Sequence, residues 1–219
     1  MSELIVHSIP GSPFGRAVVA TLEEKGAPYR FAAVPPGSLK SEVHRSRHPF
    51  GRVPVLQHGS LMLYETQAIL RYLDRIAPRP SLTPADVGAA ARMDQLLNVS
   101  DWYLFQGVNN IIGFQRIVGP RLLGLTPDET AIDDAMPKAR IVFSELSRLL
   151  GENKFFVGEQ LTLADLLIAP QLDFLAQTPE WKLLTVDVPN LVSWLDRMAD
   201  RASMRATTWE RLTELAKAA

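Results

Sequence analysis

The segment LIVHSIPGSPFGRAVVATLEEKGAPYRFAAV, residues 4–34, decides the fold of the N-terminal part of this chain. Leu4–Ser8 is a short apolar run and predicts a strand, and Tyr29–Val34 predicts a second one. Between them, apolar residues recur at helical spacing over Phe14–Leu22, and Gly26 stands where a helix C-cap glycine belongs. Because a helix that crosses over between two strands leaves them parallel, the segment predicts a β-α-β unit.

The pattern stays mixed up to a proline-rich segment. Residues 53–57 and 61–64 flank His58-Gly59-Ser60 and predict a β-hairpin, and a helix is expected from about Glu65. Residues 77–87 contain three prolines, which is typical of a linker.

Only helical periodicity follows the linker. We expect helices over roughly 88–118, 128–151, 162–177, 189–200 and 203–217. The sequence therefore predicts an α/β domain at 1–79, a linker at 80–87 and an all-helical domain at 88–219.

Composition excludes several function classes. The chain has 219 residues, a net charge of −1 and no cysteine, so disulfides, thiolate metal sites and a protein cysteine nucleophile are excluded. Without a basic surplus we expect no nucleic-acid partner. No apolar run approaches the roughly 20 residues that span a bilayer, so we expect no membrane partner. Met1-Ser2-Glu3 lacks the features of a signal peptide, and we expect a cytoplasmic protein.

Ser12 follows the turn at Pro10-Gly11 and precedes a helix, with Pro13 at the first helical position. One interpretation is that Ser12 only caps this helix. The other is functional. A helix N-terminus offers free amide donors and partial positive charge, so it favours an anion. A hydroxyl there can donate to a bound thiolate, whose pKa such surroundings lower.

Two further segments have the character of ligand sites. Pro54 suits the start of a strand, and a cis Val53–Pro54 bond would leave the Val53 amide and carbonyl free to pair with an extended peptide. Glu65 and Thr66 open a helix. They are interpreted either as simple caps or as a site in which Thr66 binds a carboxylate and Glu65 binds an ammonium.

In this order and spacing, the three sites resemble the glutathione transferase family, its serine-type members and most closely the plant phi class. The resemblance implies a thioredoxin-like N-terminal α/β domain that binds glutathione and an all-helical C-terminal domain that binds the second substrate. It implies that Ser12 is catalytic and stabilises the glutathione thiolate. The other glutathione-binding residues that it implies are Lys40, Arg52, Val53, Pro54, Glu65, Thr66 and, reaching the partner subunit's glutathione, Asp101. His48 replaces the family's usual asparagine, and Arg52 stands where glutamine or lysine is common.

Four aromatic residues are candidates for the pocket of the second substrate, although an aromatic stripe at helical spacing is more often core. They are Phe14, Phe105, Phe114 and Trp209. Thr162 and Asp165 form a capping box, so Asp165 is interpreted as structural. His44 and His48 have the spacing of two metal ligands on a helix, but neighbouring arginines and Pro49 argue against a metal.

The resemblance implies an enzyme that adds the glutathione thiolate to a hydrophobic electrophile. Glutathione is then a co-substrate, no cofactor or metal is expected, and a homodimer is expected. The alternatives are a glutathione-dependent peroxidase and a non-catalytic dimerisation or protein-binding module of the same fold. A thiol-disulfide oxidoreductase would need a cysteine that this chain lacks.

Overall fold

The structure, a computed structural model, describes residues 2–218 and divides into two compact units. The first combines the chain up to Leu82 with the residues from Ala199 onward, and the second is Thr83–Met198. The domain limits expected from the sequence assign residues 199–219 to the helical part. Residues 199–218 instead group with the first unit, because helices α10 (Ala202–Ala206) and α11 (Trp209–Ala218) pack against α1 and β2.

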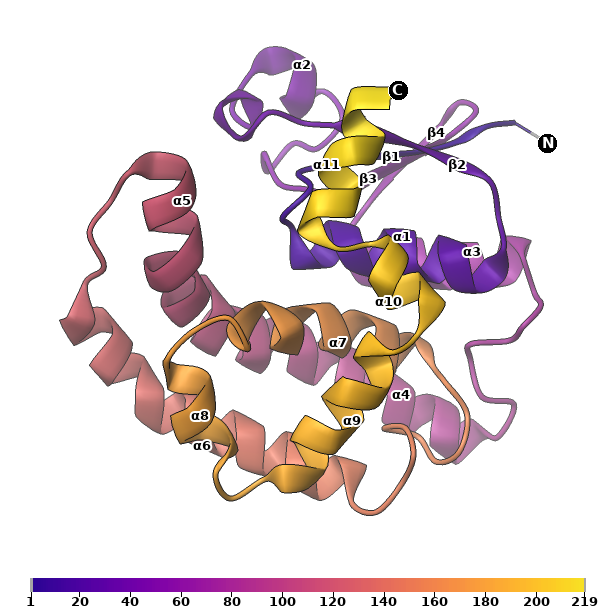
Figure 1. Ribbon diagram of the computed structural model, residues 1–219. Helices are drawn as coiled ribbons and strands as arrows, with labels where there is room; N and C mark the ends of the chain where they lie inside the picture. The colour runs from indigo at the N-terminus through magenta and orange to yellow at the C-terminus, as the bar shows by residue number, and fades with distance from the viewer. Residues whose placement is uncertain (1, 219) are drawn as a thin grey trace. The chain divides into compact units, whose positions relative to one another are not determined.

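A four-stranded mixed sheet forms the centre of the first unit, in the order β2-β1-β3-β4 (Figure 1). The strands are β1 (Leu4–Ser8), β2 (Tyr29–Ala33), β3 (Val55–His58) and β4 (Leu61–Tyr64). Strands β1 and β2 are parallel, whereas β3 is antiparallel to both of its neighbours. The predicted β-α-β unit and hairpin are therefore confirmed, as is the expected fold class of an α/β domain joined to a helical one.

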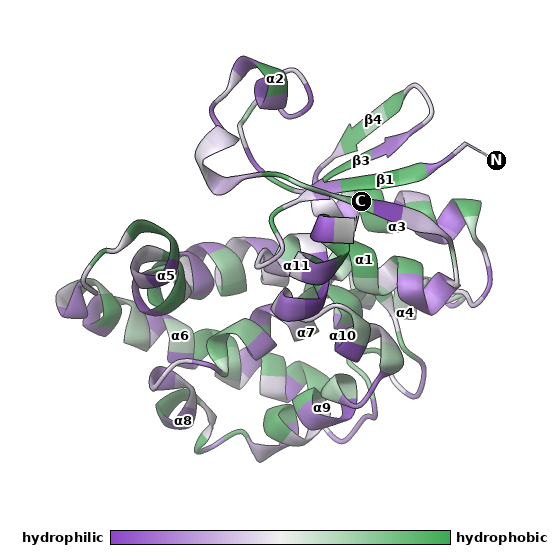
Figure 2. Ribbon diagram, turned by 45° about the horizontal axis from the view of Figure 1, so that its top comes forward, coloured by the Kyte–Doolittle hydropathy of each residue, from purple (hydrophilic) through white to green (hydrophobic). Residues whose placement is uncertain are grey.

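Helices α1 (Pro13–Lys25) and α3 (Thr66–Ile76) pack against each other and lie on the same side of the sheet (Figure 1). Two shorter elements, a 3₁₀ turn (Pro36–Ser38) and α2 (Glu42–Arg45), connect β2 to β3. Strand β1 is buried along its whole length and is mostly hydrophobic (Figure 2).

The ends of α1 follow local chemistry. Ser12 is the N-cap and Pro13 the first helical residue. Gly26 adopts a left-handed conformation, φ 59°, which glycine accepts without the steric cost of a Cβ. Gly15 lets α1 approach β1 closely, because a Cβ at this position would overlap the Ser8 hydroxyl.

The second unit consists of helices and their connecting loops, with one isolated β-bridge between Phe155 and Gly158 among the described residues. It contains α4 (Val87–Val99), η2 (Ser100–Val118), α5 (Gly119–Leu123), α6 (Glu129–Leu150), α7 (Leu163–Leu175), α8 (Glu180–Thr185) and α9 (Pro189–Ala199), whose last residue is counted with the first unit. The helix expected over 88–118 is continuous, but from Ser100 it has the wider π-type turn. The short helices α5 and α8 were not predicted. The helix expected over 203–217 is wrong as one element, because it is divided into α10 and α11 at Thr207 and Thr208.

Asp165 is a completely buried hydrogen-bond acceptor at the start of α7. Its carboxylate accepts the backbone amides of Phe156 and Thr162, both at 2.9 Å, the Thr162 hydroxyl at 2.8 Å and the Trp194 indole N–H at 3.2 Å. Burial raises the pKa of Asp165, and these donors oppose that rise. The predicted capping box is present, and its acidic member also anchors the loop before α7 and helix α9.

Candidate functional site

The Ser12 side chain lies at the N-terminus of α1 and is half-buried. Its hydroxyl oxygen accepts the Gly15 amide at 3.2 Å, and its own amide donates to the Ile9 carbonyl at 2.9 Å. A hydroxyl has one donor and two acceptor positions, so accepting one amide leaves the O–H free to donate. The predicted cap is therefore confirmed, and it is compatible with a hydrogen bond from Ser12 to an anion.

The turn that carries Ser12 is supported from the C-terminal segment. A Cβ on Gly11 would lie 2.6 Å from atoms of the Trp209 indole, so the indole packs directly on this turn. Nearby, the Arg16 guanidinium donates to the Met204 carbonyl at 3.1 Å and thereby attaches α1 to α10. Sequence reasoning assigned Trp209 to a substrate pocket and missed its contact with Gly11, because the two residues are distant in the chain.

Val53 lies two residues before β3, and the Val53–Pro54 peptide is cis, a possibility that the sequence left open. The paired residues of β3 begin at Val55, opposite His7 on one side and Tyr64 on the other. Val53 therefore lies outside the strand pairing, where its backbone groups can meet an extended peptide.

Two exposed cations lie near this segment. Gly51 has a φ of 63°, and a Cβ there would lie 2.8 Å from the Leu39 carbonyl oxygen, so the segment that contains Gly51 touches the segment that contains Leu39. Lys40 directly follows Leu39 and Arg52 directly follows Gly51, and both cations are exposed. This arrangement suits a carboxylate, which two neighbouring cations attract.

Glu65 has an unusual backbone conformation at the start of α3. Its φ of 69° is in the left-handed region, the only such value for a non-glycine residue among residues 2–218. Such conformations cost about 1–3 kcal/mol and are often retained at functional sites. The Glu65 side chain is exposed and makes no capping hydrogen bond, whereas Thr66 is buried. Simple capping by Glu65 is therefore excluded, and its carboxylate faces solvent.

Two buried histidines support these ligand-site segments, a role that sequence reasoning missed. The His44 Nε2 atom lies 2.8 Å from the carbonyl oxygen of Arg52, and Arg52 directly precedes Val53. His48 is 2% exposed, and its ring centroid lies 4.8 Å from that of Tyr64, which precedes Glu65. Burial lowers the pKa of His48.

His48 Nδ1 has no hydrogen-bond partner within the described part of the chain. Between residues 2 and 218, no group of three or more His, Asp or Glu side chains is arranged to hold a metal ion.

The remaining predicted residues divide between the two units. Phe14 and Trp209 belong to the first unit. Asp101, Phe105 and Phe114 lie on η2 in the second unit, where all three are half-buried. A pocket that combines them therefore remains a prediction.

Family models match most of both units. Residues 6–81 match the model described as glutathione S-transferase, N-terminal domain. Residues 108–202 match the model described as glutathione S-transferase, C-terminal domain. Over the described residues, no helix has both the length and the apolar character needed to cross a membrane.

Individual relatives agree with these matches. The chain is 31% identical over 192 residues to the probable glutathione S-transferase GSTF2 of rice, Oryza sativa subsp. japonica, covering 87% of this chain and 89% of the relative. It is 27% identical to glutathione S-transferase F7 of Arabidopsis thaliana, covering 94% of this chain and 99% of the relative. Among solved structures, glutathione transferase F2 from Populus trichocarpa matches with a TM-score of 0.83 and 26% identity, covering 99% of this chain and all of that one.

Proposed function

Because the chain belongs to the glutathione S-transferase family, we propose that it transfers glutathione, through its thiolate, to a hydrophobic electrophile. The resemblance to the plant phi class is confirmed by the F-class names of its relatives. Glutathione is the co-substrate, and the reaction needs no cofactor.

In the proposed complex, glutathione lies extended along the first unit. Its cysteinyl backbone pairs with the amide and carbonyl of Val53, beside Pro54. Its γ-glutamyl carboxylate accepts hydrogen bonds from the Thr66 hydroxyl and the Thr66 amide, and its ammonium lies by the Glu65 carboxylate. Its glycyl carboxylate lies between Lys40 and Arg52. These contacts place the sulfur at the N-terminus of α1.

Ser12 then donates its hydroxyl proton as a hydrogen bond to the sulfur, which favours the thiolate over the thiol. The thiolate attacks the electrophilic carbon, a C–S bond forms, and the leaving group departs with its electron pair. No bond to the protein forms, so stabilisation of the thiolate and proximity account for the rate.

The observation that carries this proposal is the position of the Ser12 hydroxyl at the start of α1, where its oxygen accepts the Gly15 amide; a hydroxyl that accepts one amide still has its O–H to donate. A hydrogen bond to a charged group contributes about 1.5–3 kcal/mol. Ser12→Ala should therefore raise the pKa of bound glutathione by about 1 to 2 and lower kcat about 10- to 100-fold near neutral pH. The measurement is thiolate absorbance against pH, together with turnover of an aryl halide.

Ser41→Ala is a matched control. Ser41 also caps a helix, and its hydroxyl accepts the His44 amide at the same 3.2 Å. Its loss should lower stability without changing the thiol pKa. An unchanged thiol pKa in Ser12→Ala, or an equal rise in both variants, would overturn the role of Ser12.

The alternative activities give different outcomes in the same screen. Consumption of organic hydroperoxides, but not of aryl halides, would establish a peroxidase. Failure to bind immobilised glutathione at millimolar concentration would leave the non-catalytic module.

The remaining parts of the proposal are a cytoplasmic homodimer, a second-substrate pocket at Phe14, Phe105, Phe114 and Trp209, and Asp101 reaching the partner subunit's glutathione. Light scattering tests the dimer. The KM for glutathione in Asp101→Asn tests the last contact and should rise.

A further inference from the structure

The buried side chain of His44 is hydrogen-bonded to a backbone carbonyl beside the proposed glutathione site. His44 lies on α2 and is 3% exposed. Its Nε2 atom lies 2.8 Å from the Arg52 carbonyl oxygen, whereas its Nδ1 atom is buried and has no partner among residues 2–218. Burial of a polar side chain is costly unless the side chain is hydrogen-bonded, so the contact with Arg52 is the one that compensates for the burial of this ring.

The acceptor decides which nitrogen of His44 carries the hydrogen. A carbonyl oxygen can only accept a hydrogen bond, so the hydrogen is on Nε2. In a neutral imidazole the other nitrogen, Nδ1, then has a lone pair and no hydrogen. The neutral His44 ring is therefore the Nε2–H tautomer, and it donates to Arg52.

The Arg52 carbonyl belongs to the same peptide unit as the Val53 amide. This peptide is trans, and in a planar trans peptide the C=O and the N–H point in opposite directions. A hydrogen bond that holds the carbonyl therefore also sets the direction of the N–H. The Val53 amide donates to no group among residues 2–218, which leaves it available to a ligand.

Few other contacts hold this peptide unit. Arg52 is exposed, and neither Arg52 nor Val53 belongs to a strand, because the pairing of β3 begins at Val55. A hydrogen bond to the carbonyl also polarises the peptide unit, and this strengthens its N–H as a donor. The contact from His44 thus orients the Val53 amide and makes it a better donor.

The His44 ring is held by the segment that follows it. The His44 carbonyl accepts the His48 amide at 2.9 Å, and the two rings are nearly parallel, with their centroids 6.5 Å apart. The His48 carbonyl in turn accepts the Gly51 amide at 2.9 Å, which turns the chain back so that Arg52 reaches His44. The donor and the peptide that it holds therefore belong to one hydrogen-bonded segment.

We propose that His44 is a positioning residue for glutathione. Its Nε2–H holds the Arg52–Val53 peptide so that the Val53 N–H points at the carbonyl oxygen of the glutathione cysteinyl residue. This rests on the proposed function, in which the cysteinyl backbone pairs with Val53. His44 acts through the peptide without touching the ligand, so it affects the affinity for glutathione and not the chemical step.

The variants His44→Leu and His44→Gln separate the donor from the bulk of the ring. Leucine removes the donor, whereas the amide nitrogen of glutamine reaches the position of Nε2 and can still donate. One neutral hydrogen bond changes an equilibrium by about two- to tenfold. Calorimetric titration with S-hexylglutathione, which has no free thiol, should therefore give a Kd about three- to tenfold higher in His44→Leu and within about twofold of the unchanged protein in His44→Gln. In turnover assays the KM for glutathione should rise by the same factor in His44→Leu, while kcat stays within about twofold.

A second ligand distinguishes positioning from a general loss of structure. An alkene isostere of the Cys–Gly peptide bond in S-hexylglutathione lacks the carbonyl oxygen that the Val53 amide is proposed to bind. His44→Leu should change the affinity for this isostere less than about twofold, because the contact that His44 positions is already missing. An equal loss of affinity for both ligands would show that His44 supports the fold only, and it would overturn the proposal.

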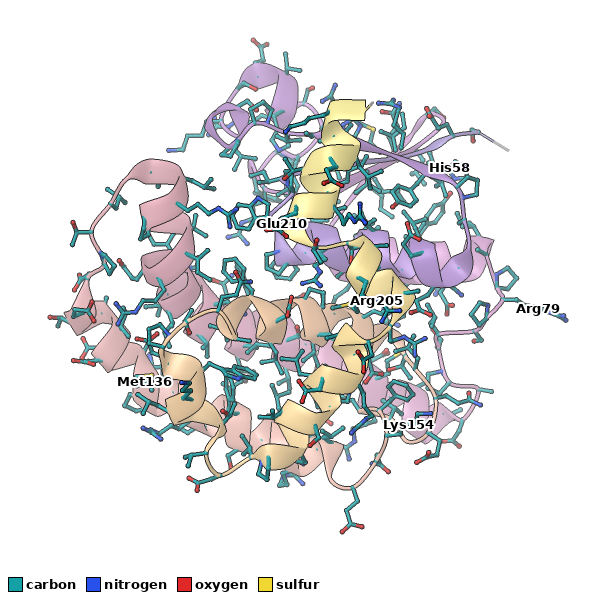
Figure 3. All side chains as sticks on the ribbon, in the orientation of Figure 1. His58, Arg79, Met136, Lys154, Arg205 and Glu210 are labelled. Carbon is teal, nitrogen blue, oxygen red and sulfur yellow. The ribbon has the colours of Figure 1, made fainter. Side chains whose placement is uncertain are left out.

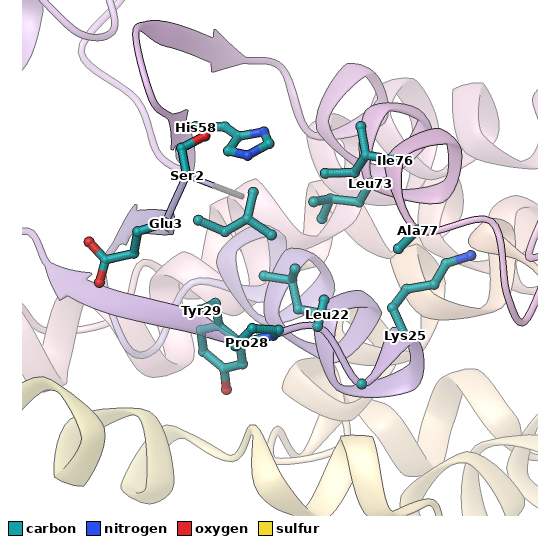
Figure 4. A pocket seen from close by; sticks show the side chains of 13 residues that line it. Ser2, Glu3, Leu22, Lys25, Pro28, Tyr29, His58, Leu73, Ile76 and Ala77 are labelled. Atoms are coloured by element: carbon teal, nitrogen blue, oxygen red, sulfur yellow. The ribbon is translucent and has the colours of Figure 1, made fainter.

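His58→Leu is the matched control. The His58 Nδ1 atom lies 2.7 Å from the Tyr72 hydroxyl, so this variant also loses one histidine hydrogen bond in the first unit. His58 (Figure 3) is the last residue of β3, roughly 10 Å along the strand from Val55. It lines a cavity there together with Ser2 and Ile76 (Figure 4). The affinity of His58→Leu for S-hexylglutathione should equal that of the unchanged protein, and a loss equal to that of His44→Leu would contradict the proposal.

If His44→Leu does not fold, ¹⁵N NMR of the unchanged protein decides. The imidazole nitrogen shifts should place the hydrogen of His44 on Nε2 at pH 7.5, and the Val53 amide should shift more with S-hexylglutathione than with the isostere. A hydrogen on Nδ1, equal shifts of the Val53 amide, or equal affinities of His44→Leu and the unchanged protein would overturn this proposal alone. No binding of S-hexylglutathione to the unchanged protein would overturn the proposed function, and this proposal with it.

Discussion

Replacement of Asp165 by alanine tests whether a single buried carboxylate holds the second unit together. The carboxylate accepts four hydrogen bonds, from two backbone amides, one hydroxyl and one indole N–H. Each buried donor that loses its acceptor costs about 1–3 kcal/mol, and some recover through water. We therefore expect Asp165→Ala to lower the free energy of unfolding by about 3–5 kcal/mol, near the upper end of single substitutions.

Asp128→Ala is the matched control for this prediction. Asp128 is also a helix N-cap, but it is exposed and accepts only the Ala131 amide, at 3.1 Å. Loss of one exposed cap should cost about 1 kcal/mol. Urea unfolding followed by far-UV circular dichroism measures both variants. If Asp165→Ala costs less than about 1.5 kcal/mol, or no more than the control, then the burial of these donors does not have the cost assumed here.

Three more outcomes are expected. Lys25→Met should lower the free energy of unfolding by about 3–5 kcal/mol, because it removes the buried Lys25 ammonium from the buried Asp74 carboxylate. Urea unfolding of this variant and of Lys25→Met combined with Asp74→Leu should show that the second change restores part of the loss. Gly11→Ala should cost about 1–3 kcal/mol and reduce turnover, since its methyl group overlaps the Trp209 indole; full activity and an unchanged Tm would contradict this packing. Burial lowers the folded-state pKa of His48, assisted by the charges of His44 and Arg52 and opposed by Glu65. As the pH falls, the unfolded state therefore takes up a proton at this histidine before the folded state does, and the free energy of unfolding falls below about pH 6.5 toward the folded-state pKa. The free energy of unfolding, measured between pH 7.5 and 5, should fall less in His48→Asn than in the unchanged protein. Equal slopes against pH in the two proteins would contradict this prediction.

Much of the first unit could be predicted because its signals are local. Alternation of strand and helix patterns, the N-cap at Ser12 and the C-cap at Gly26 are all encoded within a few residues of where they act. The capping box at Thr162 and Asp165 is of the same kind. Such local preferences agree with the fold, as they do in sequences that fold reliably.

The features that could not be predicted depend on contacts between distant parts of the chain. The apolar spacing over residues 88–118 indicates a helix but does not reveal the π-type turn that begins at Ser100. The left-handed φ of Glu65 is held by its surroundings, and nothing in the residue type indicates it. Packing of Trp209 on Gly11 joins the two ends of the chain and has no sequence signal.

The C-terminal segment that packs on α1 has a consequence for biosynthesis. Gly11 and Ser12 are synthesised before the second unit, whereas the indole that supports their turn is on α11 and is synthesised after it. Helix α10, whose Met204 carbonyl accepts a hydrogen bond from the Arg16 guanidinium, is also synthesised after the second unit. The nascent sheet and α1 can form beforehand, yet the support of the serine turn waits for residues 199–218. The second unit is thus translated between two parts of the unit that carries the proposed thiolate site, and that site receives its support only after residues 199–218 have been synthesised.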